Sequence, residues 1–599
     1  MIYHCEEHTC NYWDEGEKLP ERCPQCGRKL LRANEADMTG DDWTALGNTL
    51  WDAEASDKKR MVDCFRKAAY LGSAWGVCNL GICMEQGNGV EADPVQAFWL
   101  YQQAVEMGSL NAVCCLGVCY QYGIGTAPDA KQAAELYCKA AEYGSPRGQM
   151  LLARAFHDGI GVEADAAEAV HWVRAAAYQR YGEGMHRLGV CYEYGDGVEQ
   201  NWERAVHWFR EAAESGVSGA MTDLGYCYEK GCGVEQSWEQ AFSWYRRGAE
   251  CGDPVSMSNL GLCYKRGYGV EQNWQEAIKW YEQGAQCGDL QSMHNLACCY
   301  EGGEGVEQNE DRAFYWYRRS AEGGNGSAMC NLGRCYKRGY GVEQNWQEAV
   351  KWYEQGAQCG NLQSMHNLAC CYEHGEGVEQ NMTEAIRWYT AAAEGGNADD
   401  MYELGWQYDH GEGVEQDMKK AICWYERAAE QNYPAAMNSL GECYAMGRGV
   451  PRDLETAMEW YRRAAELGEA MADYNMGWHL EQAGKLSEAY AHYRKAADGN
   501  DDSAWWALGR FYENGVVVAQ DGKEARRCYE TGEKLGSVKC KMRLARCKLL
   551  GIGGRRAKNA GLDLCRQALE LAKESSEKED YGYEAEMNLL RRTIAENES

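Results

Sequence analysis

The sequence predicts an all-α protein, an α/α superhelical solenoid of about fifteen helix-turn-helix repeats. Three observations predict this fold: a motif that returns every 36 residues, a helix-capping side chain at a fixed place in each period, and apolar residues at helical spacing. At 599 residues the chain also far exceeds the roughly 250–300 residues at which a single core stops growing. A repeat array accommodates that length because each repeat packs only on its neighbours.

The period is marked by a Gly-x-Gly motif. Its successive copies lie 36 residues apart without a slip, which is the signature of a repeat architecture. The first glycines of the copies are Gly87, Gly123, Gly159, Gly195, Gly231, Gly267, Gly303, Gly339, Gly375, Gly411 and Gly447. We interpret the motif as a structural turn between two helices, because glycine punctuates helical sequences.

A helix start follows each Gly-x-Gly motif after six residues. The residue there always has a side chain that accepts hydrogen bonds from the free N–H groups of a first helical turn. These predicted caps are Asp93, Asp129, Asp165, Asn201, Ser237, Asn273, Asn309, Asn345, Asn381, Asp417 and Asp453. They fix the beginning of the second helix in each unit.

The second helix carries an apolar stripe that includes Ala277, Trp280 and Tyr281. One position of this stripe is tryptophan in successive units. We predict that these rings lie in the packed core of the solenoid. They are Trp172, Trp208, Trp244, Trp280, Trp316, Trp352, Trp388, Trp424 and Trp460.

The first helix of each unit is marked by a leucine followed by a small residue, as in Leu260-Gly261. The small residue lies on the apolar face and lets a neighbouring helix approach closely. The pair can be followed from Leu46-Gly47 to Leu544-Ala545, which gives fifteen units. The first unit and the segment "EQAGKLSEA" have shorter loops, and both are expected to keep their two helices. We therefore predict a solenoid over residues 40–575 and a C-terminal capping helix and tail over residues 576–599.

Composition excludes several classes of partner. The formal net charge is −31, so a broad surface repels phosphate backbones and anionic membranes. No apolar run reaches the 18 or so residues that span a bilayer, and the N-terminus lacks the pattern of a secretory signal. We expect a cytoplasmic protein that neither binds nucleic acid nor inserts into a membrane.

Thirty cysteines would suit a secreted disulfide framework, but their positions argue against it. One cysteine stands at the same place in many units, directly before a tyrosine. Residues a whole repeat apart are too distant for a disulfide, which needs Cα atoms about 4.4–6.8 Å apart. These cysteines are Cys119, Cys191, Cys227, Cys263, Cys299, Cys335, Cys371 and Cys443. We interpret them as small buried apolar residues in a reducing compartment.

The motif A-x-x-x-L-G-x-x-Y-x-x-G-x-G-V-x-x-N/D-x-x-x-A-x-x-W-Y-x-x-A-A-x-x-G resembles the Sel-one-like repeat (SLR), a relative of the tetratricopeptide repeat. The resemblance covers about residues 40–575. It implies a right-handed superhelix of antiparallel helix pairs. It also implies an adaptor role, because members of this family mostly hold protein partners together in bacterial signalling and in eukaryotic quality control.

The N-terminal segment, residues 1–35, differs from the repeats and resembles a zinc-ribbon or rubredoxin-type knuckle. It carries Cys5, Cys10, Cys23 and Cys26, and His8 is an alternative ligand to complete the first half of the site. Four such ligands close a structural Zn²⁺ site, and a segment this short needs a staple to fold. We expect structural zinc in a docking module; iron and unliganded thiols are the alternatives.

No catalytic motif stands out, and we expect no enzyme activity. Ser56-x-x-Lys59 matches a β-lactamase motif, but its companion motifs are missing. A cysteine-rich branch of the Sel-one-like family binds or hydrolyses β-lactams and has a disulfide in each unit. This chain departs from that branch, because Met257 and Met293 stand where a regular cysteine partner is needed. A β-lactamase-like repeat hydrolase and a zinc-ribbon nucleic-acid-associated regulator are kept as alternative functions.

The leading hypothesis is a non-catalytic scaffold whose concave groove binds a protein or peptide. By resemblance to tetratricopeptide arrays, the residue after the Leu-Gly pair faces this groove. That row begins with Asn48, Ile82, Val118 and Arg154 and includes Glu442 and Arg510. The partner-binding residues that we predict from it are Val190, Tyr226, Leu262, Cys298, Arg334, Cys370, Trp406 and Trp478.

One stretch of the array has been copied whole. Residues 259–309 return as residues 331–381 with four differences, and the offset of 72 equals two units. The most drastic difference, Leu262 against Arg334, falls on the predicted groove row. His294 and His366 are copies of each other, so a catalytic role would need two identical sites. We predict surface or groove histidines instead.

Overall fold

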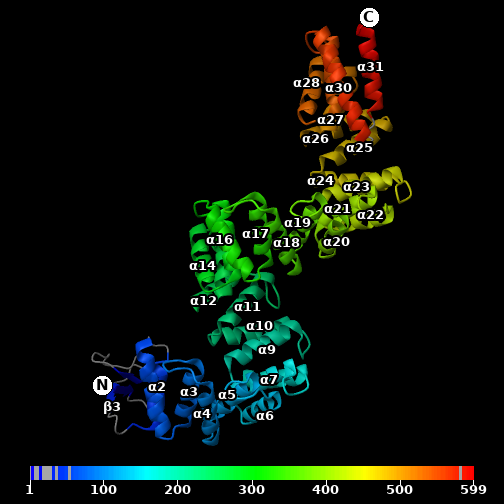
Figure 1. Ribbon diagram of the computed structural model, residues 1–599. Helices are drawn as coiled ribbons and strands as arrows, with labels where there is room; N and C mark the ends of the chain where they lie inside the picture. Colours follow the sequence, from blue (N-terminus) through cyan, green and yellow to red (C-terminus); the bar gives the residue numbers. More distant parts are fainter. Residues whose placement is uncertain are drawn as a thin grey trace. The chain divides into compact units, whose positions relative to one another are not determined.

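The structure is a computed structural model that describes residues 2–5, 13–15, 30–33, 38–51, 55–578 and 583–598. These residues form helices joined by short loops, with three short strands near the N-terminus (Figure 1). The chain divides into two compact units, Met1–Asn309 and Glu310–Ser599. The prediction of a helical-repeat solenoid is confirmed in the described part of each unit.

The first unit begins with strands β1 (Ile2–Cys5), β2 (Trp13–Glu15) and β3 (Leu30–Ala33). They form an antiparallel sheet in the order β2-β1-β3. Its helices are α1 (Gly40–Thr49), α2 (Ala55–Tyr70), α3 (Ala74–Gln86), α4 (Pro94–Glu106), α5 (Leu110–Tyr122), α6 (Ala130–Glu142), α7 (Pro146–Asp158), α8 (Ala166–Tyr178), α9 (Gly182–Tyr194), α10 (Trp202–Glu214), α11 (Ser218–Lys230), α12 (Trp238–Glu250), α13 (Pro254–Arg266), α14 (Trp274–Gln286) and α15 (Leu290–Gly302).

The second unit continues the alternation of first and second helices. Its helices are α16 (Glu310–Glu322), α17 (Gly326–Arg338), α18 (Trp346–Gln358), α19 (Leu362–His374), α20 (Met382–Glu394), α21 (Ala398–His410), α22 (Met418–Glu430), α23 (Pro434–Met446), α24 (Leu454–Glu466), α25 (Ala470–Gln482), α26 (Leu486–Asp498), α27 (Asp502–Asn514), α28 (Gly522–Lys534), α29 (Val538–Leu550), α30 (Lys558–Lys578) and α31 (Glu584–Glu598). The odd-numbered helices up to α29 are first helices, and their even-numbered successors are second helices.

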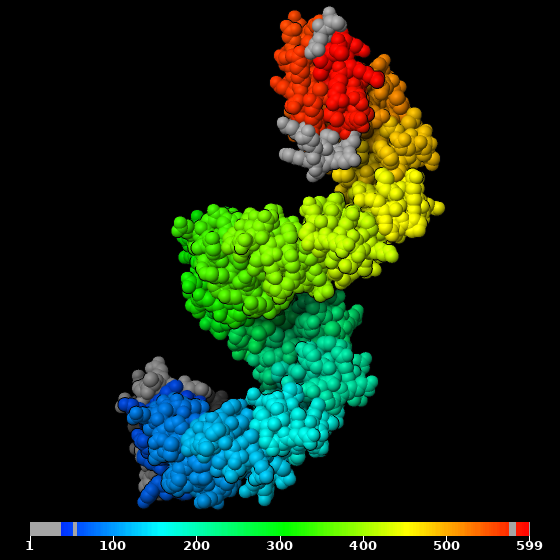
Figure 2. Space-filling model, turned by 45° about the vertical axis from the view of Figure 1, so that its right-hand side comes forward, coloured from blue at the N-terminus to red at the C-terminus, as the bar shows by residue number. Residues whose placement is uncertain are grey.

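Contacts within each unit run between helices that are close in sequence. A first helix packs on the second helix of its own pair, as α3 packs on α4, and that second helix packs on the next first helix, α5. The colours in Figure 2 accordingly change gradually along each unit. The shorter loops predicted in the first pair and before α26 leave both helices in place, and α31 packs on α29 and α30.

Ten of the eleven predicted helix caps are confirmed, and the cap at Asn309 stays a prediction. The side chain of Asn273 accepts a hydrogen bond from the Glu276 backbone N–H at 3.1 Å, which satisfies one of the free donors of α14. Asp93, Asp129, Asp165, Asn201, Ser237, Asn345, Asn381, Asp417 and Asp453 cap their helices in the same way.

Each Gly-x-Gly motif is a structural turn, as predicted. Gly267 ends α13 in the left-handed region at φ 74°, where its N–H donates to the Cys263 carbonyl at 2.8 Å. The second glycine, Gly269, is also left-handed, and a Cβ there would collide with the carbonyl of Trp238 on the preceding second helix. The first glycine is needed for its left-handed backbone conformation, and the second also because the preceding second helix lies too close for a side chain.

The core is built around a buried side chain on each second helix that is a tyrosine in most units. Tyr245 is almost fully buried, its ring lies against Gly225, and its hydroxyl donates to Glu229 at 2.8 Å. The glycine of the Leu-Gly pair thus makes room for an aromatic ring. The packing of a buried ring against this glycine recurs at Tyr101, Tyr137, Tyr281, Tyr353, Tyr425, Tyr461, Tyr493 and Tyr529.

The predicted tryptophan ladder lies at the edge of the core. The tryptophans are half-buried and most of them pack against the buried clusters, whereas the residue that follows each of them, a tyrosine in most units, is buried. Successive helical residues point about 100° apart, so only one of the two can aim directly at the first helix. Arginines cover the outer faces of several tryptophans, for example Arg247 at 4.3 Å from the Trp244 ring centre.

The periodic cysteines are buried free thiols, as predicted. Cys263 and Cys299 are at most 2% exposed, and every cysteine from Cys64 to Cys565 is unbridged. Burial raises the pKa of the Cys263 thiol to about 12 and that of Cys299 to about 11. These thiols therefore remain neutral and act as small apolar residues.

Candidate functional site

The predicted groove row lies on successive first helices of the first unit. Val190, Tyr226, Leu262 and Cys298 belong to α9, α11, α13 and α15, and none of them is buried. Tyr226 is 43% exposed and Leu262 37% exposed, although the residues directly before and after each of them are buried. The row is therefore a set of surface positions that the repeat packing leaves open.

The predicted groove row is also accessible to solvent in the second unit. Arg334, Cys370, Trp406 and Trp478 lie on α17, α19, α21 and α25 and are half-buried or exposed. The Trp406 ring stacks on His410 with ring centres 4.4 Å apart. These side chains differ in size and charge from unit to unit, whereas the buried positions around them repeat.

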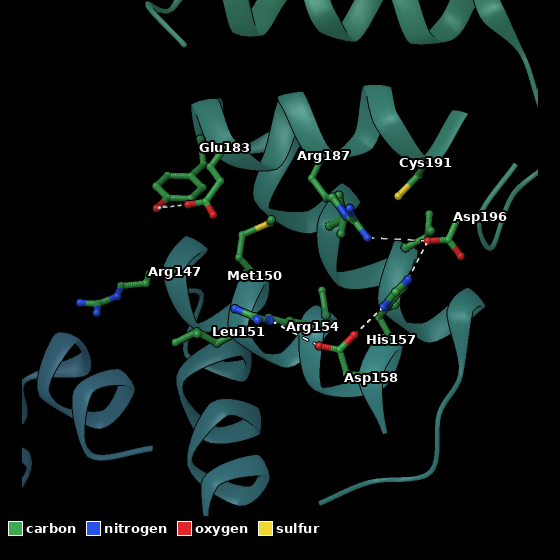
Figure 3. A pocket seen from close by; sticks show the side chains of 15 residues that line it. Arg147, Met150, Leu151, Arg154, His157, Asp158, Glu183, Arg187, Cys191 and Asp196 are labelled. Carbon is green, nitrogen blue, oxygen red and sulfur yellow. Dashed lines mark hydrogen bonds and ion pairs between the residues drawn. The ribbon is translucent and has the colours of Figure 1, made fainter. Parts of the chain in front are cut away.

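A hollow of about 550 Å³ lies along the row in the first unit, between α7, α8 and α9 (Figure 3). Met150, Leu151, Val170 and Val173 supply apolar walls. The polar lining comes from Arg147, Arg154, His157, Asp158, Tyr181, Glu183, Arg187 and Asp196. Of these residues only Arg154 belongs to the predicted row.

Ion pairs fix one end of the hollow. His157 contacts Asp158 through Nδ1 at 2.7 Å and Asp196 through Nε2 at 3.2 Å (Figure 3). Arg154 adds a contact to Asp158 at 3.4 Å, and Arg187 lies 3.8 Å from Asp196. The hydrogen bond from His157, assisted by Arg154, lowers the pKa of Asp158. This end is therefore a pre-organised, nearly neutral network.

Arg147 lies at the opposite end of the hollow (Figure 3). Its guanidinium donates to the Asn111 side-chain oxygen at 2.8 Å and to the Cys115 sulfur at 3.6 Å. Neither of these two partners is a carboxylate. Arg147 is exposed, and no sequence pattern marks it because its position is not part of the repeat motif.

The predicted metal ligands lie largely outside the described part of the chain. Cys10, Cys23, Cys26 and the alternative ligand His8 are not described, and of Cys5 only the backbone is, in β1. Among the residues whose side chains are described, no group of three or more His, Cys, Asp or Glu side chains is arranged to hold a metal ion. No described helix combines the length and apolar character needed to cross a bilayer.

The fold and its open first-helix face define a helical-repeat protein of the class that typically serves as a protein-interaction scaffold. The family model for the Sel1 repeat matches residues 76–109, 112–145, 146–181, 182–217, 218–253, 254–289, 290–325, 326–361, 362–397, 398–433, 434–469, 470–501 and 504–537. The chain therefore belongs to the Sel1 repeat family. The helix pairs α1–α2 and α29–α30 add to these thirteen matches.

The chain is also similar to two solved structures. The chain is 32% identical to c5321, a protective antigen present in uropathogenic Escherichia coli strains displaying an SLR fold, with a TM-score of 0.51 over 75% of this chain and 97% of that chain. It is 34% identical to a Sel1 repeat protein from Oxalobacter formigenes, with a TM-score of 0.38 over 41% of this chain and 96% of that chain. No curated protein matched the sequence.

Proposed function

We propose that this protein is a non-catalytic scaffold or adaptor that binds a protein or peptide along the first-helix face of its repeats. The observation that carries the proposal is the row of open positions between buried neighbours, of which Tyr226 and Trp478 are examples. Repeated packing holds these positions at regular spacing while their side chains vary. Such a surface can recognise an extended partner segment, because each unit contributes its own contact.

The hollow between α7, α8 and α9 suggests the chemistry of one partner contact. Its apolar walls at Met150 and Val173 suit an apolar side chain, and the nearby guanidinium of Arg147 suits a carboxylate. The network at His157 is already satisfied and needs no further ion. We propose that the partner segment places an apolar residue in the hollow and an acidic group on Arg147.

Changing Tyr226 and Leu262 together to alanine is expected to weaken binding of the partner roughly thirtyfold, because truncating each interface anchor costs about 1 kcal/mol or more. Arg147→Glu should reduce it further by reversing a charge. Trp99→Ala is a matched control, because Trp99 is a 53% exposed aromatic on the second helix α4. The measurement is quantitative affinity purification from the native cell. Equal recovery by wild type and the double variant, or no specific partner, would count against a groove scaffold.

We further propose that residues 1–35 hold a structural Zn²⁺ and act as a docking module. The ligands would be Cys5, Cys10, Cys23 and Cys26, with His8 as the alternative to complete the first half. The antiparallel register of β1 and β3 pairs Cys5 with Leu30, which supports a fold that brings the first and last parts of the segment together. Zinc would close this fold without an open coordination position.

Native protein is expected to contain one zinc ion per chain, and Cys23→Ser with Cys26→Ser is expected to remove it. Cys251→Ser with Cys287→Ser is the control, because these exposed thiols lie on the repeats. Elemental analysis of purified protein provides the measurement. Separate Cys10→Ser and His8→Ala variants show which side chain completes the site. Equal zinc content in the Cys23/Cys26 variant and the control would rule out this assignment.

The compartment that we propose is the cytoplasm. The described cysteines are free thiols, and those at the periodic positions are packed as apolar side chains. A reducing compartment keeps thiols in this state. The net charge of −31 supports a protein partner over nucleic acid.

A further inference from the structure

A thiol, an imidazole and a carboxylate meet on the first-helix face of the second unit. Cys370 Sγ lies 3.6 Å from His366 Nε2, one turn earlier on α19. His366 Nδ1 lies 2.8 Å from Asp400 Oδ1, which comes from α21. The sulfur and the carboxylate contact opposite nitrogens of the ring, so the imidazole bridges them. This is the arrangement that activates nucleophilic cysteines.

Burial of Asp400 explains why the histidine is held in place. Asp400 is fully buried, and within the described structure its second oxygen, Oδ2, accepts no hydrogen bond. A buried carboxylate is costly unless a cation compensates it, and His366 is the group in contact. The hydrogen bond to Asp400, followed by that to Cys370, raises the pKa of His366 to about 10. At neutral pH the ring is therefore an imidazolium beside the thiol.

The site is open to small molecules. The His366 side chain is 25% exposed and Cys370 is half-buried, so solvent reaches both. The adjacent Cys371 is fully buried, and burial raises its pKa to about 12. Of these two neighbouring cysteines, only Cys370 combines access with a cationic partner.

We propose that Cys370, His366 and Asp400 form a reactive-thiol site that exchanges with small disulfides. The Cys370 thiolate attacks one sulfur of the disulfide, a new S–S bond forms, and the original S–S bond breaks. The other half leaves as a thiolate and takes up the proton that Cys370 released. Cys370 is oxidised to a mixed disulfide, and the leaving sulfur is reduced to a thiol. His366 stabilises the attacking thiolate, and Asp400 is a positioning residue.

The surroundings favour a disulfide over an acyl substrate. Acyl transfer needs donors for a developing oxyanion, whereas the backbone N–H groups near Cys370 are used within α19. In thiol–disulfide exchange the negative charge stays on sulfur atoms, so no hydrogen-bond donors for an oxyanion are needed. The inference does not depend on the proposed partner, since it concerns the chemistry of one side chain.

Charge around the site limits the kind of disulfide. The Tyr389 hydroxyl of α20 lies 3.4 Å from Cys370 Sγ and donates to Glu373 at 2.6 Å. Glu373 and Glu403, from α19 and α21, add acidic side chains beside Tyr389 and His366. Acidic groups also repel anionic reagents. The substrate class is therefore an uncharged or cationic disulfide.

The test is the rate at which Cys370 reacts with neutral dithiodipyridine at pH 7, followed by site-resolved mass spectrometry. In folded full-length protein Cys370 is expected to react roughly tenfold faster than in urea-unfolded protein, because only folding holds the His366 ring 3.6 Å from the sulfur, where it orients and stabilises the attacking group. Burial alone would make the folded rate lower. The exposed Cys423 is the internal control and should not gain from folding.

His366→Ala and Asp400→Asn separate the roles. Both variants are expected to lose the advantage of the folded state at Cys370 while leaving the Cys423 rate unchanged. Asp400→Asn keeps the shape of a buried side chain, so circular dichroism should show an unchanged fold. The proposal is overturned if wild-type Cys370 reacts no faster when folded than when unfolded. It is equally overturned if a folded Asp400→Asn variant keeps the wild-type rate.

Discussion

Replacing Arg543 by methionine is expected to lower the free energy of unfolding of the C-terminal repeats by about 3–5 kcal/mol. Arg543 contacts both oxygens of Glu586 at 2.6 and 2.7 Å and one oxygen of Glu513 at 3.2 Å. The side chains of Arg543, Glu586 and Glu513 are 14%, 7% and 10% exposed. Without the guanidinium, Glu586 would be a buried carboxylate without its bidentate partner.

A second substitution tests whether the unpaired carboxylate of Glu586 causes the loss of stability. In the double variant Arg543→Met with Glu586→Leu both charges are gone, and most of the lost stability should return, because a buried ion pair is often replaceable by apolar residues. Urea unfolding followed by circular dichroism provides the measurement. A single variant that stays within about 1 kcal/mol of wild type would show that this pair does not hold α31 on α29.

The second large effect is expected at Gly441 on α23. A Cβ at this position would lie 2.5 Å from Cε1 of the buried Tyr461 ring, so Gly441→Val forces the ring or the helix to move. We expect a loss of about 3 kcal/mol from overpacking. Helix propensity predicts the opposite sign, because glycine is the least favourable residue in a helix interior except for proline.

Ala369 is the matched control, because it occupies the same repeat position and already carries the methyl group beside a buried tyrosine, Tyr389. Ala369→Gly should cost only about 1 kcal/mol, which is the difference in helix propensity. Thermal and urea unfolding measure both variants. If Gly441→Val is as stable as wild type, the tyrosine ring does not set the helix spacing there.

Much of the fold was predictable because its signals are local. Asn273 marks a helix start through a hydrogen bond three residues away, and Gly267 marks a helix end through its own backbone conformation. The sequence does not separate the half-buried Trp280 from the fully buried Tyr281, because both are aromatic and they are adjacent. A sequence pattern does not decide which of two neighbouring rings points at the facing helix.

The candidate sites were predictable only in part. The repeat register identified open positions such as Tyr226 and Cys370, but not the polar lining of the hollow at Arg147. The duplication predicts equivalent roles for His294 and His366. The copies are not equivalent, because the repeat position of Asp400 is Ala328 in the earlier copy. This difference lies outside the duplicated block, so comparison of the two copies does not reveal it.

The sequence by itself determined the 36-residue period, the helix starts and ends, and the burial of the periodic cysteines. These features depend on interactions between residues close in sequence, and the many copies of the repeat show which positions carry them. Only the tertiary structure decided which side chains of different helices meet. Asp400 reaches His366 across 34 residues because α21 follows α19 in the stack, and that contact turns one of many cysteines into a candidate reactive thiol.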